Sequence, residues 1–252
     1  MNDEITPTEV VRLLTALKGL YTFKDLSEYL KIPVQVLWRY TKYLNVPEKT
    51  TAKKILLEIE RSNLLYNAFD KIIAINRYGY IETWRINKNI HLLNLFGYLV
   101  FRYLKEKNVK IDAIIPLSID GIPFATIVSN WTTASLYIPY PEAYLTMDRW
   151  KSKEYLKDGE ERMRRIYLPK GIFRKDDKVL MVDLVLEDAS VVNAMYELIE
   201  AEDATPWGVI VALSKNDKWL ENIIYPIEKK IVYTIPKTQI ERKIRYKSQS
   251  YI

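Results

Sequence analysis

Residues 179–191, Val-Leu-Met-Val-Asp-Leu-Val-Leu-Glu-Asp-Ala-Ser-Val, constrain the fold of this chain more than any other segment. An apolar run interrupted by Asp183 ends in a polar turn, and residues 191–199 then have the apolar spacing of a helix. This pattern is typical of a buried parallel strand, a loop and a helix. Ligands of open parallel sheets bind at the carboxyl ends of strands, where helix N-termini attract phosphate. We therefore expect a parallel α/β sheet with a binding site at this turn.

The same stretch resembles the signature of type I phosphoribosyltransferases. In that family, four apolar residues precede two acids, two apolar residues, Thr-Thr-Gly, any residue, and Thr or Ser. Asp183 retains the first acid, whereas Leu184 replaces the second. Glu-Asp-Ala at 187–189 replaces Thr-Thr-Gly, and Val191 replaces the last hydroxyl. The resemblance implies acids that hold ribose hydroxyls and a turn that cradles the 5-phosphate; an ordinary strand and turn without a ligand is the alternative.

A second loop carries the same resemblance. Residues 118–125 follow a predicted buried strand at 111–117 and are similar to the pyrophosphate loop of the family through Gly121, Pro123 and Ala125. The strand predicted at 134–138 leads into Pro-Tyr-Pro, where active family members have an Arg-Lys pair that grips pyrophosphate. The charged segment 142–171 occupies the place of the family's catalytic loop or hood hairpin, and a solvated loop is the alternative.

The departures from the signature argue against catalysis. Glu187 and Asp188 repel a phosphate that the helix dipole attracts only modestly, and an enzyme needs its phosphate, ribose and pyrophosphate contacts together. We assign no catalytic residue, cofactor or metal, and expect that any effector is nucleotide-related and supplies hydroxyl, amino or base N–H donors. The candidate ligand-binding residues are Ser118, Asp120, Gly121, Asp183, Glu187, Asp188, Ala189, Ser190 and Val191.

The N-terminal part of the chain predicts a helix-turn-helix. Helices are expected at 7–20, 24–31, 34–44 and 49–66, and Ile32-Pro33 separates the second from the third. Leu26, Tyr29 and Leu30 should face the core from the second helix. In the third, Val36 or Leu37, Tyr40 and Leu44 should form the inner stripe. The segment 37–40, followed by Pro47 and Ala52, resembles the repressor-like domain of archaeal phosphoribosyltransferase-like regulators, although Trp38 replaces a Ser.

The outer face of the third helix is the candidate DNA-reading surface. Gln and Arg read adenine and guanine edges in the major groove, and flanking lysines contact phosphates. Trp38 either contacts DNA or packs against another domain or a dimer partner, and a generic helical adaptor is the alternative for the whole region. The candidate DNA-binding residues are Gln35, Trp38, Arg39, Lys42, Lys49, Lys53 and Lys54.

Composition narrows the class of protein. The chain of 252 residues has no Cys and one histidine, His91, which excludes disulfides, Cys nucleophiles and multi-His zinc sites. No signal-peptide pattern or membrane-length apolar stretch occurs, so we expect a cytoplasmic protein. Residues 229–252 contain seven basic residues and one acid, so their net charge of +6 equals that of the whole chain. This basic end suggests either an anionic partner or a solvated tail.

The remaining patterns complete the expected architecture. Paired strands are predicted within 71–85, a long amphipathic helix at 87–108, and further strands at 207–213 and 225–235. The fold class is α/β, with an all-α helix-turn-helix domain at 1–62 and a phosphoribosyltransferase-like parallel sheet flanked by helices at 63–252.

The arrangement resembles that of the bacterial purine repressor and of archaeal regulators. It implies a homodimeric regulator that binds double-stranded DNA, controls nucleotide or sugar genes, and uses its transferase-like domain for dimerisation and effector sensing. An active phosphoribosyltransferase and a non-enzymatic assembly protein are the alternatives.

Overall fold

The computed structural model describes residues 6–142, 149–238 and 240. The chain forms two compact units, and each is discontinuous in sequence. The first contains residues 1–74 and 84–108, and the second contains residues 75–83 and 109–252. The predicted boundary after residue 62 falls within the first unit.

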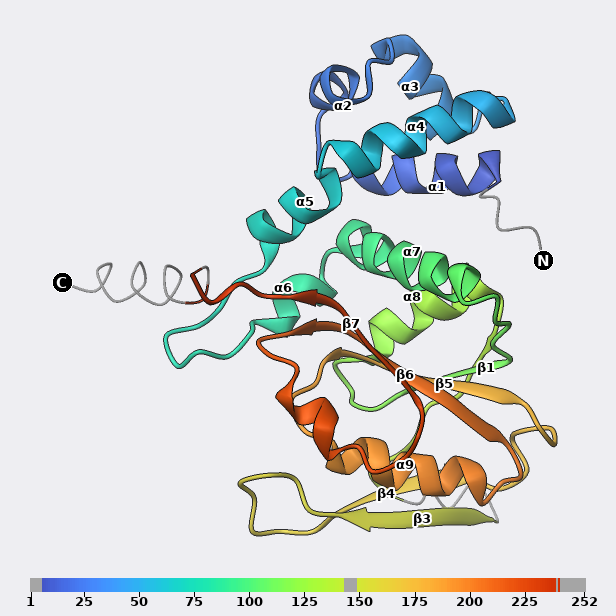
Figure 1. Ribbon diagram of the computed structural model, residues 1–252, viewed down its shortest axis with the longest axis vertical. Coiled ribbons are helices and arrows are strands. Elements are labelled where there is room, and N and C mark those ends of the chain that lie inside the picture. Colours follow the sequence, from blue (N-terminus) through green and yellow to red (C-terminus); the bar gives the residue numbers. More distant parts are fainter. Residues whose placement is uncertain (1–5, 143–148, 239, 241–252) are drawn as a thin grey trace. The chain divides into compact units, whose positions relative to one another are not determined.

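The first unit is helical (Figure 1). Its elements are α1 (Pro7–Lys18), α2 (Phe23–Leu30), α3 (Val34–Thr41), α4 (Lys49–Arg61), α5 (Leu64–Ile72), most of α6 (Thr83–Asn87) and α7 (Ile90–Glu106). A capping box joins Thr6 and Glu9 at the start of α1, and Gly19 ends that helix. The ring of His91 lies so close to Gly19 that a Cβ at this position would overlap it. The α1–α7 packing therefore requires glycine there.

Helices α2 and α3 pack against each other, and Leu26, Leu30, Leu37 and Tyr40 are buried as predicted. Two expectations about buried residues are wrong. Tyr29 is 41% exposed and Leu44 is 66% exposed. Helix α3 ends at Thr41 rather than at residue 44. The next positions leave helical geometry because Tyr43 has a φ of 55°, which carries Leu44 away from the inner stripe.

Two further boundaries differ from the predictions. The fourth helix ends at Arg61 rather than near residue 66, because Asn63 adopts a left-handed conformation with φ of 54° and α5 then starts at Leu64. The paired strands predicted within 71–85 reduce to one antiparallel bridge between Ile75 and Ile81. Helix α5 takes up the first residues of that segment, and its Phe69 is buried.

The second unit contains a five-stranded sheet of order β2-β1-β5-β6-β7, with parallel pairing throughout. The strands are β1 (Ala113–Pro116), β2 (Ser135–Leu136), β5 (Lys178–Val185), β6 (Thr205–Ser214) and β7 (Glu228–Thr234). The expected α/β class is confirmed. Strand β5, the apolar run of the signature, is buried along most of its length at the centre of the sheet, as the run of apolar residues predicts.

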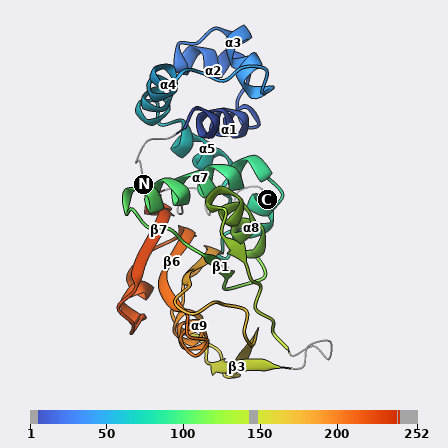
Figure 2. The same cartoon turned by 90° about the vertical axis from the view of Figure 1, so that its right-hand side faces the viewer.

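Helices cover both faces of this sheet (Figure 1). Helix α8 (Ile122–Thr132) packs against β1 and β5, and α9 (Ser190–Glu200) packs against β6 from the opposite face. A two-stranded antiparallel hairpin, β3 (Trp150–Tyr155) and β4 (Arg164–Pro169), packs on α9. Figure 2 shows α9 between this hairpin and the sheet. A hairpin is thus present in the charged segment, and the solvated-loop alternative does not hold for these strands.

One apolar core joins the hairpin, α9 and the face of the sheet that α9 covers. Alternate residues of β1 and β5 enter it, as the two-residue period of a strand requires. Its strand and helix members include Ile115, Met181, Val192, Met195 and Leu168. The loop between β5 and α9 is therefore held at both ends, because it joins two elements that are buried in this core.

Candidate functional site

A cavity of about 1020 Å³ lies at the carboxyl ends of β1 and β5. Its lining comes from residues 80–83, the loop after β1, residues 138–141, the β3–β4 hairpin and the loop after β5. This is the edge of a parallel sheet at which ligands bind. Of the candidate ligand-binding residues, Ser118, Asp120, Glu187, Asp188 and Val191 line the cavity. Gly121, Asp183, Ala189 and Ser190 are not part of that lining.

Asp183 is completely buried at the end of β5. Its Oδ1 accepts hydrogen bonds from the Ser118 hydroxyl at 3.0 Å and from the Val185 backbone N–H at 3.3 Å. Its Oδ2 is buried without a hydrogen-bond partner among the described residues. Burial raises the pKa of Asp183 to about 7, although the two hydrogen bonds favour the charged form. The carboxyl group is therefore enclosed by its own fold and does not face the cavity.

Gly121 provides the close approach that encloses this carboxyl group. A Cβ at Gly121 would lie 3.0 Å from the Asp183 carboxylate atoms, so a side chain there would displace it. The Gly121 backbone N–H donates to the Ser118 hydroxyl oxygen at 3.1 Å. The loop after β1 and the end of β5 thus form one hydrogen-bonded unit, in which glycine serves packing.

Asp188 uses its acceptors within the loop. It is nearly fully buried, and its Oδ1 accepts from the Ser190 backbone N–H at 2.9 Å. Its Oδ2 accepts from the Ser190 hydroxyl at 2.6 Å and from the Asp158 backbone N–H at 3.4 Å. Ala189 takes an ordinary right-handed conformation with φ of −84°. The Ser190 N–H at the start of α9, a donor that a phosphate would use, is already bonded to a carboxylate.

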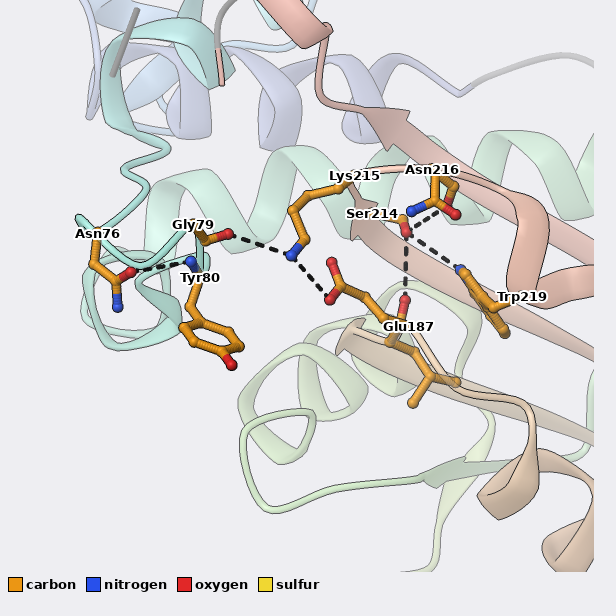
Figure 3. A network of polar contacts seen from close by, with 9 residues as sticks. Asn76, Gly79, Tyr80, Glu187, Ser214, Lys215, Asn216 and Trp219 are labelled. Atoms are coloured by element: carbon orange, nitrogen blue, oxygen red, sulfur yellow. Dashed lines mark hydrogen bonds and ion pairs between the residues drawn. The ribbon is translucent and has the colours of Figure 1, made fainter. Parts of the chain in front are cut away.

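Glu187 is paired with a lysine that the sequence patterns did not identify. Lys215 Nζ lies 3.1 Å from Glu187 Oε2 and also donates to the Gly79 carbonyl at 3.3 Å (Figure 3). The ammonium is 5.6 Å from the centre of the Tyr80 ring. Lys215 directly follows β6, whose neighbour in the sheet is β5. Neighbouring parallel strands end at the same edge of a sheet. A polar residue directly after β6 was therefore the sequence feature that could have identified Lys215 as part of the site.

Ser214, the residue before this lysine, is held by hydrogen bonds of its own. Its buried hydroxyl lies 2.6 Å from the Asn216 carbonyl and 3.4 Å from the Leu186 carbonyl, and it accepts from the Trp219 indole N–H at 3.2 Å (Figure 3). A hydroxyl has one proton, so the shorter contact to Asn216 is the better donor geometry. These bonds join the loops after β5 and β6.

Charges of the hairpin that border the cavity are also paired. Arg164 donates from Nε and Nη2 to the two carboxylate oxygens of Glu160, at 2.6 Å each. Arg165 is paired with Glu154 across the hairpin. Asp120, on the opposite wall, accepts from the Thr83 hydroxyl at 2.8 Å. The cavity therefore presents charged groups that mostly neutralise one another.

The outer surface of α3 differs in character. Gln35, Trp38 and Arg39 are exposed on the helix, and Lys42 is exposed as its C-terminal cap residue. Trp38 retains 45% of its accessible surface. Lys49, Lys53 and Lys54 are exposed on α4. The helix presents Gln35, Trp38 and Arg39 together at the predicted spacing, and the lysines belong to the next elements.

Two remaining expectations concern other parts of the chain. The basic C-terminal end lies mostly outside the described residues, because only residues up to 238 and residue 240 of it are described. Within residues 6–142 and 149–240, apart from 239, no cluster of three His, Cys, Asp or Glu side chains has the arrangement of a metal site. No helix of that part is long and apolar enough to cross a membrane.

Comparison with known proteins supports the fold and suggests a functional class. No family model matches the chain. Over 134 residues it is 26% identical to the probable purine biosynthesis transcriptional regulator PurR of two Streptococcus pneumoniae strains. The match covers 53% of this chain and 48% of each relative. The chain thus spans about half the length of the curated relatives it matches.

Similar solved structures include adenine phosphoribosyltransferases. The enzyme of Thermoanaerobacter pseudethanolicus matches with a TM-score of 0.59 and 14% identity, covering 68% of this chain and 99% of that one. The Leishmania tarentolae enzyme matches with a TM-score of 0.59 and 12% identity over 71% of this chain and 90% of that one. At these identities the match shows the fold alone. The predicted phosphoribosyltransferase-like fold is therefore confirmed.

Proposed function

We propose that the chain is a DNA-binding transcriptional regulator whose phosphoribosyltransferase-like unit serves dimerisation and effector sensing. The exposed outer face of α3 is the observation that carries this proposal. Gln35 and Arg39 are exposed on α3, which we assign as the second helix of a helix-turn-helix, and side chains of these types read base edges. The weak similarity to PurR regulators supports the same class and suggests nucleotide genes as the target.

From the contacts that the carboxylates at the end of β5 and in the following loop already make, we infer that this unit does not catalyse phosphoribosyl transfer. Asp183 is enclosed, Glu187 is paired with Lys215, and Asp188 is bonded to Ser190. A phosphate at this loop would have to displace carboxylates from partners that they already hold. Catalysis needs prepositioned contacts to the reacting groups, and these contacts are replaced here by contacts within the protein.

The cavity remains a candidate effector site. Its lining combines the aromatic rings of Tyr80, Tyr140 and Tyr155 with the carboxylates of Asp120 and Glu187. Rings and acceptors suit a planar molecule that carries N–H or O–H donors better than a free phosphate. We propose a nucleotide-related effector that is bound through its base or sugar.

We also propose a homodimer. One small helix-turn-helix contacts few base pairs, and two heads related by two-fold symmetry match a palindromic site. The chain has a mass of 29.8 kDa, and light scattering at micromolar concentration should give twice that mass. A monomer at that concentration would contradict the dimer.

A binding experiment tests the regulator directly. Fluorescence anisotropy would measure affinity for DNA upstream of the chain's own gene and for random DNA of the same length, at several salt concentrations. We expect tighter binding to the upstream fragment, and loss of the preference in Arg39→Ala. Arg61→Ala is the matched control, because Arg61 is exposed at the end of α4 outside the proposed reading surface. Equal binding of both DNAs by the wild type would contradict the proposal.

A further inference from the structure

The segment that follows α3 has an unfavourable backbone conformation and exposes apolar side chains. Tyr43 has a φ of 55°, in the left-handed region that favours glycine or asparagine. Its N–H donates to the Tyr40 carbonyl at 2.9 Å, and the Leu44 N–H donates to the Arg39 carbonyl at 3.0 Å. These two bonds are those of a Schellman motif, in which the left-handed position is usually glycine. The chain instead has a large aromatic residue at that position.

The motif also explains why Leu44 is exposed. The residue after the left-handed position usually packs on an apolar side chain near the end of the helix. The corresponding helix residue here is Arg39, which is exposed and charged. Leu44 retains 66% of its accessible surface and Tyr43 retains 55%. Tyr43 is one of seven non-glycine residues with a positive φ in the described part of the chain, and the exposed Leu44 beside it is the feature that points to a partner.

Other large apolar side chains of the segment from α2 to α4 are also exposed. The exposed large apolar residues between positions 29 and 46 are Tyr29, Val34, Trp38, Tyr43, Leu44 and Val46. Residues 29–54 also contain six basic residues and one acid, Glu48. Exposed apolar side chains that are bordered along the sequence by exposed basic residues suit a partner that is anionic and has apolar faces. A second copy in a two-fold contact would bring two like-charged surfaces together.

We propose that Tyr43 and Leu44 form an apolar prong that inserts between base pairs of the bound DNA, beside the groove that α3 enters. The inference rests on the proposed DNA-binding function. DNA has phosphates for the basic border, and an opened base step offers apolar base faces to the prong. Insertion of apolar side chains kinks the duplex at deformable steps such as TA and CA. Arg39 and Gln35 read base edges, whereas the prong selects a deformable step.

Leu44→Ser tests the prong with little risk to the fold, because Leu44 is exposed. On the upstream fragment that the wild type binds, we expect roughly tenfold weaker binding, from the loss of one apolar side chain from the contact. The dependence of affinity on salt should stay unchanged, because no phosphate contact is lost. Energy transfer between dyes at the two DNA ends should show a smaller bend. Leu57→Ser is the matched control, since Leu57 is 49% exposed on α4, outside residues 29–46.

Tyr43→Gly gives a second test, in which stability and DNA binding should change in opposite directions. Glycine suits the left-handed conformation, so the melting temperature should rise or stay equal. DNA affinity and bending should both fall because the ring is absent. A structural role for the ring would instead lower the melting temperature and leave the bend unchanged.

The outcomes separate the two proposals. Wild-type binding without bending, or Leu44→Ser that binds and bends DNA as the wild type does, would overturn the prong and leave the regulator in place. A wild type that prefers no DNA fragment would overturn the regulator and the prong with it. A shift of Leu44→Ser from dimer to monomer, with wild-type bending by the remaining complex, would identify the surface as a contact between copies and overturn the prong.

Discussion

The loop after β5 and the outer face of α3 both contain polar side chains at predicted binding positions, but they use them differently. At the end of β5 and in the loop after it, Asp183, Glu187 and Asp188 hold partners from the same chain. On α3, Gln35 and Arg39 are exposed to solvent. Buried polar groups need partners to avoid a desolvation penalty, whereas exposed ones remain available to a ligand. Under the proposed function, the loop after β5 is mainly structural, and the exposed face of α3 is the surface that contacts DNA.

The largest expected effect is the absence of transferase activity. With magnesium, phosphoribosyl pyrophosphate and each of adenine, guanine, hypoxanthine, uracil and orotate, pyrophosphate release should stay at background. The physical reason is that Glu187 and Asp188 place negative charge at the position of the phosphate. An active transferase of the same fold is the control for the assay. Turnover by the wild type that disappears in Asp183→Asn would show that the end of β5 supports catalysis, contrary to this prediction.

The second effect concerns stability and pH. The pKa of Asp183 is about 7 in the folded protein, against an ordinary value of 3.8. Between these two values the folded state binds a proton that the unfolded state has released. The unfolding free energy should therefore fall as pH rises, by up to about 1.4 kcal/mol for each pH unit in this window. Asn cannot ionise, so Asp183→Asn should remove this part of the slope.

Urea denaturation of both proteins at pH 4.5, 6 and 7.5 measures the effect. The difference between the two curves isolates Asp183 from the other carboxyl groups, which titrate alike in both. Parallel curves would show that the carboxyl group is better solvated than its enclosure by Ser118 and Gly121 indicates.

The third effect is on sequence preference. Arg39→Ala should cost about 1–3 kcal/mol on the preferred DNA and relax specificity at one base pair, if the guanidinium contacts a guanine through two hydrogen bonds. Affinity for a set of single-base variants of the bound fragment measures this. Unchanged affinity for both preferred and random DNA, with an intact fold, would remove α3 as the reading element and favour the assembly-protein alternative.

A smaller effect distinguishes phosphate contacts from base contacts. Lys42→Ala should weaken binding to all DNA sequences alike. It should also reduce the slope of log affinity against log salt by about one unit, because one fewer counterion is released. A change in sequence preference without a change of slope would assign Lys42 to the base edges instead.

The smallest effect tests the loop itself. Lys215→Met should lower the unfolding free energy by about 1 kcal/mol or less, because the Lys215 and Glu187 side chains are partly exposed and solvent weakens their attraction. Glu187→Gln should have a similar effect, and the double variant should cost less than the sum. Additive effects would show that the two side chains act independently of each other.

The sequence predicted the sheet because strand β5 and helix α9 have strong periodic patterns with a turn between them. It did not predict the partner of Glu187. That ion pair joins residues 28 positions apart on neighbouring strand ends, and pairing along a strand edge depends on strand order. The enclosure of Asp183 was also missed, because an acid after a buried strand has the same local pattern whether it faces a ligand or the protein.

The end of α3 shows a different limit. Leu44 lies seven positions after Leu37, which is the spacing of one helix face, so periodicity placed it in the core. Neither Tyr43 nor Leu44 has the local features of a helix terminator, since a left-handed residue is usually glycine or asparagine. Where local preference and structure disagree in this way, functional sites are common.

The packing of α1 on α7 determines how the helical unit can be separated from the rest of the chain. Helix α7 lies within residues 84–108, and Lys105 pairs with Glu9 of α1 at 3.1 Å. A fragment that ends near residue 62 would leave the buried face of α1 uncovered in water. The helical unit is thus not encoded by one continuous N-terminal segment. Its α1 packs on a helix that the chain reaches only after residues 75–83, which belong to the sheet-containing unit, so a cut near residue 62 removes part of its own core.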